Sequence, residues 1–197
     1  NRANVYKNQK KYALAQADYS KSIELDKENP QWYEQRANCF VAMEDYTSSL
    51  KDLDKAIELA PKDAFYFNNR ADFYMEYKQE DDLALKDYAT AIKLSSDTYQ
   101  TTRALNNSAL IFEKQEQYDL AIVDYSAAIE LTPMESLYYS NRANIYKNQK
   151  KYALAQADYT HAINLDKNNP EKYKGKLSKK IPDGSPIGTE SCNFNYK

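Results

Sequence analysis

Glycine is nearly absent from this chain. Only three glycines occur among its 197 residues, and all lie near the end of the sequence, at Gly175, Gly184 and Gly188. Residues 1–174 therefore cannot form the glycine-rich loops that bind phosphate in dinucleotide-binding and P-loop proteins. The same absence suits a helical chain, because a glycine inside a helix costs about 1 kcal/mol relative to alanine.

Residues that commonly carry catalysis or bind metals are also scarce. The two cysteines, Cys39 and Cys192, have different surroundings and indicate neither a disulfide framework nor a metal site. His161 is the only histidine, so a histidine-dependent triad could form only there. We therefore expect that the protein is not an enzyme and has no catalytic residues, no metal site and no cofactor.

Charge and hydropathy exclude two further classes of function. The 29 acidic residues slightly outnumber the 27 lysines and arginines, whereas a dedicated nucleic-acid binder needs a net basic face. No apolar run approaches the roughly 18 residues of a membrane-spanning helix. We expect no nucleic-acid partner and no membrane span, and we favour a cytoplasmic location. Because the sequence begins at Asn1, inside a repeat, we expect it to be a fragment or a processed form.

What the chain does contain is one pattern, repeated five times. Residues 1–30 return almost unchanged at 141–170. A small residue recurs at Ala3, Ala37, Ala71, Ala109 and Ala143, with spacings of 34, 34, 38 and 34 residues. Such a period indicates stacked supersecondary units. The longer step predicts one extra residue in a turn at 78–82 and about three more near 95–101.

Each repeat is predicted to contain two helices. In residues 30–61 the apolar and small side chains keep a three-to-four spacing, which restarts after residues 44–45. Asn29 is suited to cap the first helix, and Pro30 is tolerated in its first turn. Pro61 cannot continue the second helix. The pattern therefore indicates two antiparallel helices joined by a short polar turn.

The positions that pack these helices also recur. In the first helix, the small residue is followed three positions later by an aromatic residue: Tyr6, Phe40, Tyr74, Phe112 and Tyr146. The second helix carries a small residue (Ala15, Ser49, Ala84, Ala121, Ala155), a large one (Tyr19, Leu53, Tyr88, Tyr125, Tyr159) and another small one (Ser22, Ala56, Ala91, Ala128, Ala162). This pattern resembles the tetratricopeptide repeat (TPR) family.

The resemblance implies an all-α fold, a right-handed α-solenoid of about five helix-turn-helix TPR units plus a C-terminal capping helix. The array would span 1–180, with repeats at about 1–29, 30–63, 64–101, 102–135 and 136–169 and the capping helix at 170–180. Residues 181–197 would form a non-repeat tail or linker. Arg2, Arg36, Arg70 and Arg142 recur beside the small alanine, which predicts inter-repeat hydrogen bonds or salt bridges to Asp18, Asp52, Asp87 or nearby carboxylates.

The resemblance also places a concave peptide-binding groove on the face of each first helix that points away from the second. The candidate residues are Asn38, Phe65, Asn68, Asn69, Asp72, Arg103, Asn106, Asn107, Leu137, Asn141 and Asn144. An asparagine amide offers a donor and an acceptor together, which suits a peptide backbone. The alternative for each asparagine is that it braces neighbouring repeats.

A weaker and incomplete similarity links the chain to co-chaperones whose repeats clamp the terminal carboxylate of Hsp70 or Hsp90. Such a clamp would use Asn38, Asn69 and Arg103. Glu34 and Asn107 stand where basic residues are needed, so most of the charge-assisted bonding would be missing.

The leading hypothesis is a protein–protein interaction scaffold that binds a peptide or protein segment in this groove. Two alternatives remain open: a regulatory or targeting TPR region of a longer enzyme or receptor, and an Hsp70/Hsp90-type co-chaperone. Self-association through the array ends or the tail is a further hypothesis.

Overall fold

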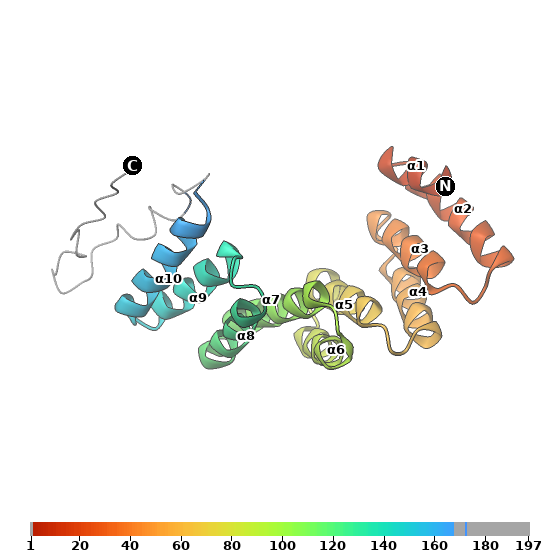
Figure 1. The fold of residues 1–197 in the computed structure, drawn as a ribbon. Helices are drawn as coiled ribbons and strands as arrows, with labels where there is room; N and C mark the ends of the chain where they lie inside the picture. The colour runs from red at the N-terminus through yellow and green to blue at the C-terminus, as the bar shows by residue number, and fades with distance from the viewer. Residues whose placement is uncertain (1, 168–171, 173–197) are drawn as a thin grey trace. The chain divides into compact units, whose positions relative to one another are not determined.

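The computed structural model describes residues 2–167 and 172, and all regular structure in these residues is helical (Figure 1). The chain divides into two compact units, residues 1–111 and 112–197, and each unit is described by itself. The expected tail at 181–197 and, apart from Lys172, the expected capping helix at 170–180 lie outside the described residues.

The first compact unit holds three complete helix pairs and most of the helix that follows them. The pairs are α1 (Arg2–Asn8) with α2 (Tyr12–Leu25), α3 (Pro30–Ala42) with α4 (Tyr46–Leu59), and α5 (Ala64–Phe73) with α6 (Asp81–Leu94). A π-helix, η1 (Tyr74–Lys78), extends α5, and α7 (Thr98–Lys114) begins the fourth repeat. Neighbouring pairs are joined by packing of α2 on α3 and of α4 on α5.

The second compact unit contains α8 (Tyr118–Leu131), α9 (Ser136–Asn148) and α10 (Tyr152–Leu165). Helix α9 packs against both α8 and α10. Across both compact units the order of long helices and short turns follows the repeat pattern of the sequence. The predicted all-α repeat fold is therefore confirmed.

Local sequence explains where the helices of the second and third repeats begin. Asn29 accepts a hydrogen bond from the Gln31 backbone N–H at 3.1 Å, and Pro30 occupies the first helical turn, as predicted. Asp45 caps α4 by accepting from Ser48 N–H, and Asp63 caps α5 by accepting from Phe65 N–H. Each cap satisfies a backbone donor that has no partner within its helix, which is worth about 1 kcal/mol.

The recurring small and large residues form the core, as the pattern predicts. The five alanines that define the period are at most 1% exposed. The large residues of the second helices, Tyr19, Leu53, Tyr88, Tyr125 and Tyr159, are also buried. Small side chains let the paired helices approach closely, and the large ones fill the remaining space.

Four arginines join the helices by a recurring ion pair. Each donates two hydrogen bonds to an aspartate on the second helix of its own repeat: Arg2 to Asp18, Arg36 to Asp52, Arg70 to Asp87 and Arg142 to Asp158. Three of them also bond to the second helix of the preceding repeat: Arg36 to Ser20, Arg70 to Asp54 and Arg142 to Ser126. The predicted aspartate partners are confirmed, but the prediction that these bonds run between repeats is wrong, because each aspartate lies in the same repeat as its arginine. The bonds between repeats are the additional ones to Ser20, Asp54 and Ser126.

The turn after each first helix uses a residue in the left-handed conformation. These residues are Lys10, Glu44, Gln79, Glu116 and Lys150, with φ between 55° and 61°. Each of these residues follows the end of a first helix, at the position where glycine is usual. The described repeats therefore hold five strained turns that follow directly from the shortage of glycine.

The longer third step agrees with the prediction near 95–101 and differs from it in the place of the single extra residue. The extra residue lies within the π-helix Tyr74–Lys78, and not in the turn at 78–82. A π-helix adds one residue while its backbone groups stay hydrogen-bonded, whereas a longer turn would leave some of them unpaired. The remaining extra residues lengthen the start of α7, which begins at Thr98 and adds about one helical turn.

The buried tyrosines predict a distinctive response to alkali. Burial raises the pKa of Tyr19 and Tyr159 to about 12, and it raises the pKa of Tyr88 and Tyr125 as well. Tyrosine in an unfolded chain loses its proton near pH ~10, whereas the buried hydroxyls of the folded chain keep theirs to higher pH. The free energy of unfolding therefore falls as the pH rises from about 10 through about 12. Stability below that range is unaffected by these groups.

We expect the tyrosinate absorbance to rise in two phases, the later one coinciding with the loss of helical circular dichroism. In strong denaturant all 19 tyrosines should titrate together. A single phase near pH ~10 with the helices intact would contradict the burial of these side chains.

Candidate functional site

The first helices of repeats two to four bring four of the predicted groove residues to one pocket. Asn38 comes from α3, Asn69 and Asp72 from α5, and Arg103 from α7. The pocket has a volume of about 170 Å³ and lies within the first compact unit. We call these four residues, together with Asn107 of α7, the polar cluster.

Asp72 is the centre of the polar cluster. Its carboxylate accepts hydrogen bonds from the Tyr88 hydroxyl at 2.5 Å, from the Asn107 amide at 2.9 Å, and from the Arg103 guanidinium. Arg103 also donates to the Asn69 side-chain oxygen at 3.0 Å. Burial raises the pKa of Tyr88, and the negative charge of Asp72 raises it further. The cluster is thus a preformed network that holds side chains of α5, α6 and α7 in fixed positions.

The same network gives little support to a carboxylate clamp. Arg103, the only cation among the three clamp candidates, is already paired with Asp72. Glu34 is 5% exposed and accepts hydrogen bonds from the side-chain amides of Asn38 and Gln35, both at 2.6 Å. A ligand carboxylate at this place would meet two acidic groups, one of them buried, and would have to displace a protein partner from the arginine.

Three other predicted residues of the first compact unit have different surroundings. Asn68 is fully buried, and its amide donates to the backbone and side-chain oxygens of Gln100 at 3.0 and 2.9 Å. It therefore braces α5 against α7 and has no surface to offer a ligand. Asn106 is half-buried and donates to the Asn107 side chain. Phe65 is half-buried, with its ring edge-to-face on Tyr66.

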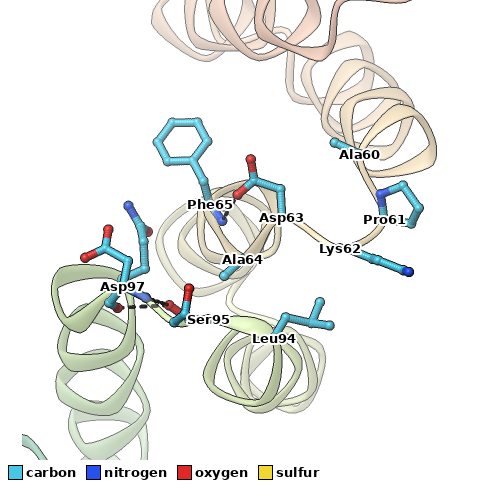
Figure 2. Close-up of a pocket in the computed structure, with 11 residues that line it drawn as sticks. Ala60, Pro61, Lys62, Asp63, Ala64, Phe65, Leu94, Ser95 and Asp97 are labelled. Atoms are coloured by element: carbon cyan, nitrogen blue, oxygen red, sulfur yellow. Dashed lines mark hydrogen bonds between the residues drawn. The ribbon is translucent and has the colours of Figure 1, made fainter.

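Phe65 also lines a larger, shallower pocket at the start of the first helices. Figure 2 shows this pocket between the α4–α5 loop, with Pro61 and Asp63, and the α6–α7 loop, with Ser95 and Asp97. Its volume is about 580 Å³. The hydrogen bonds drawn there close the two loops internally, since Asp63 accepts from Phe65 N–H, and Ser95 and Asp97 bond to each other.

The second compact unit contains the remaining predicted residues. Asn144 is half-buried and accepts from the Tyr159 hydroxyl at 2.6 Å. Asn141 is half-buried, and Leu137 is 40% exposed at the start of α9. The bond to Tyr159 shows that Asn144 contributes to packing inside its own repeat.

Comparison with known proteins decides the family. Sequence profiles described as tetratricopeptide repeat match residues 1–29, 31–63, 102–133 and 136–169. The chain belongs to the tetratricopeptide repeat family. The matched segments do not include residues 64–101, the TPR repeat that holds the π-helix.

Several solved structures have a similar fold at low sequence identity. A crystal structure of MamA is 16% identical, with a TM-score of 0.74, covering 87% of this chain and 98% of MamA. PilF of Pseudomonas aeruginosa is also 16% identical, with a TM-score of 0.73 and coverage of 93% and 90%. YrrB, described as a TPR protein with an unusual peptide-binding site, is 20% identical, with a TM-score of 0.66 and 88% of each chain covered. No curated protein sequence matches this TPR chain significantly.

Neither a membrane span nor a metal site occurs in the described part of the TPR array. None of its helices is both long enough and apolar enough to pass through a membrane. Residues 2–167 and 172 also contain no group of three or more histidine, cysteine, aspartate or glutamate side chains arranged to hold a metal ion.

The pocket at the polar cluster includes residues that the groove prediction did not contain. These residues are Val41, Ser49, Leu53, Phe73, Glu76 and Tyr77. The sequence does carry a signal for two of them, because Ser49 and Leu53 depart from the alanine and tyrosine that the other TPR repeats have at the same places. The sequence signal for the π-helix that brings Glu76 and Tyr77 to the pocket is the one-residue insertion between Ala71 and Ala84, which is predicted above to lie in the following turn.

Proposed function

We propose that this TPR array binds a peptide or protein segment on the face formed by α3, α5 and α7. The observation that supports the proposal most directly is the polar cluster, in which side chains from two first helices are fixed by mutual hydrogen bonds around Asp72. A preformed site loses little side-chain freedom when a ligand binds, so more of the interaction energy contributes to affinity.

The chemistry of this face suits a peptide backbone better than a terminal carboxylate. Asn38, Asn69 and Asn107 provide amide groups, each with donors and an acceptor that can pair with backbone carbonyls and N–H groups. The charges of Arg103 and Asp72 offset each other, so the face lacks the unpaired positive charge that selects anions.

The proposal is tested by selecting binders from a library of random linear peptides and measuring their affinity by calorimetry. The double variant Asn69→Ala with Arg103→Ala removes two members of the polar cluster. We expect at least about a tenfold loss of affinity, equivalent to about 1.4 kcal/mol. This is the size expected when one hydrogen bond to a charged group is lost.

The matched control is Asn148→Ala with Lys151→Ala, which removes an amide and a cation at positions of the second compact unit that lie far along the chain from the polar cluster. Circular dichroism would verify that both double variants keep their helices. Equal affinity of the selected peptides for the parent and for the Asn69/Arg103 variant would refute the proposed binding face.

A further inference from the structure

The pocket at the polar cluster is lined by both apolar and polar side chains. The apolar lining consists of Val41, Leu53, Phe73 and Tyr77, and the polar lining includes Asn38, Asn69, Asp72, Glu76 and Arg103. Ser49, which is fully buried on α4, lies in its lining. We call this cavity the Ser49 pocket.

A missing tyrosine ring is the first departure from the repeat pattern at this place. In the first, third and fifth repeats a buried tyrosine of the second helix donates its hydroxyl to the residue that follows the small alanine: Tyr19 to Asn4, Tyr88 to Asp72 and Tyr159 to Asn144. In the second repeat the tyrosine is replaced by Leu53. Asn38 occupies the acceptor place there, and its amide bonds to Glu34 instead. The second repeat therefore lacks a phenol that three other repeats bury and bond in this way.

An unsatisfied hydroxyl is the second departure. Ser49 stands where the other four repeats have Ala15, Ala84, Ala121 and Ala155. It is 0% exposed, and its hydroxyl oxygen has no hydrogen-bond partner among the described residues. A buried polar group without a partner is destabilising, so its presence calls for an explanation such as a ligand group.

The third departure is the π-helix, which forms the remaining wall. It contributes Glu76 and Tyr77 to the pocket. The Tyr77 ring stacks on Tyr46 at 5.4 Å and lies 5.8 Å from the Phe73 ring, so an aromatic wall is held in place. Single π-helical turns within α-helices occur frequently at functional sites. The three departures, two in the second repeat and one in the third, thus all line one cavity.

We propose that the Ser49 pocket binds the side chain of a tyrosine presented by the peptide ligand, its ring against the apolar side chains of the lining and its hydroxyl bonded to Ser49. Because Ser49 has no exposed surface in the unliganded chain, binding includes a movement of lining side chains that opens a path to its hydroxyl. This inference rests on the proposed function and names the residue that the binding face selects. The volume of about 170 Å³ fits a single ring, since an apolar cavity of about 150 Å³ holds benzene. A phenol hydroxyl both donates and accepts, so it would satisfy Ser49 in either direction.

The charged side chains of the pocket lining discriminate against anionic rings. Asp72 and Glu76 are two carboxylates, and Arg103 is one cation that is already paired with Asp72. A phosphotyrosine would bring about two further negative charges to this place. The Ser49 pocket is therefore specific for the unmodified phenol.

The probes are N-acetyl-tyrosinamide, N-acetyl-phenylalaninamide and N-acetyl-phosphotyrosinamide, each titrated into the full chain and followed by amide chemical shifts in NMR spectra. The tyrosine probe is expected to shift resonances of Ser49, Leu53 and Tyr77. The phenylalanine probe should bind at the same place about fivefold more weakly, because it leaves the Ser49 hydroxyl without a partner. The phosphotyrosine probe should cause no such shifts.

Two variants that copy the other repeats test the mechanism with little risk of unfolding. Leu53→Tyr restores the ring that the other four repeats carry, and it should fill the pocket and abolish binding of the tyrosine probe. Ser49→Ala restores the usual alanine, and it should retain ring binding but lose the preference for tyrosine over phenylalanine. Leu14→Tyr, which adds the same ring at a half-exposed position of α2, is the control and should bind like the parent.

Each outcome decides one question. Undiminished binding of the tyrosine probe to Leu53→Tyr, or an unchanged tyrosine preference in Ser49→Ala, overturns the assignment of the pocket. Absence of any probe binding also overturns it, while peptide binding that depends on Asn69 and Arg103 leaves the proposed function standing. Probe binding with the expected variant effects supports the pocket, even if the peptide selection yields no ligand and the broader proposal fails.

Discussion

Replacing Arg70 by alanine is expected to lower the free energy of unfolding by roughly 3 to 5 kcal/mol, the cost of leaving a buried charge without its partner. Arg70 donates two hydrogen bonds to Asp87, which is only 4% exposed, and a third to Asp54. Its guanidinium also lies over the Tyr74 ring, 5.9 Å from the centroid. Removing the side chain would therefore leave the Asp87 carboxylate between helices without a cation.

The measurement is urea denaturation followed by circular dichroism. Arg2→Ala is the matched control, because Arg2 makes the same two bonds to Asp18 with a side chain that is 70% exposed. Exposed ion pairs contribute little, so this control should denature almost like the parent. The double variant Arg70→Leu with Asp87→Leu should recover most of the loss, because it removes both charges and keeps apolar volume. Similar losses in Arg70→Ala and Arg2→Ala would show that burial does not determine the effect.

Introducing glycine at the five left-handed turn positions is expected to stabilise the chain. These positions are Lys10, Glu44, Gln79, Glu116 and Lys150, and all five lie in turns that end a first helix. A residue with a Cβ atom in this conformation costs about 1 to 2 kcal/mol, whereas glycine adopts it freely and loses about 0.5 to 1 kcal/mol more than alanine in chain entropy. The net gain should be about 0.5 to 1 kcal/mol for each site, and distant sites add.

The five single variants and the combined variant would be compared by urea denaturation, with the combined gain expected at roughly 2.5 to 5 kcal/mol. Glu44→Ala is the control, since it shortens the side chain but keeps the Cβ atom, and it should give no gain. If Glu44→Ala and Glu44→Gly stabilise equally, the benefit comes from the side chain and not from the backbone conformation.

The fold could be predicted from the sequence because the residues that pack the helices recur at the same positions in every repeat. The recurring alanines and tyrosines lie in the core, Asn29 and Pro30 begin α3, and the arginines bond to the predicted aspartates. The position of the extra residue could not be predicted in the same way. A one-residue insertion between Ala71 and Ala84 is compatible with a longer turn or with a π-helix, and only tertiary packing selects between them.

The candidate site was less accessible to sequence reasoning. Repeat position locates Asn68 and Asn69 on the same helix, but one position on a helix rotates the side chain by about 100°, so adjacent residues have different neighbours. Asn68 is buried against Gln100, whereas Asn69 bonds to Arg103 at the pocket. The prediction that the polar cluster contacts a ligand remains a prediction, and the Ser49 pocket became visible only when side chains of separate repeats were placed together.

The paired bonds of the arginines bear on how cooperatively the array unfolds. In an array whose repeats contact only their neighbours, cooperativity depends on the interface between each repeat and the next. Arg36 and Arg70 each link two second helices across such an interface. In the fourth repeat the arginine place is taken by Ser108. The arginine bonds of the first compact unit therefore join its first three repeats, and local opening of one of these repeats is expected to spread to the next.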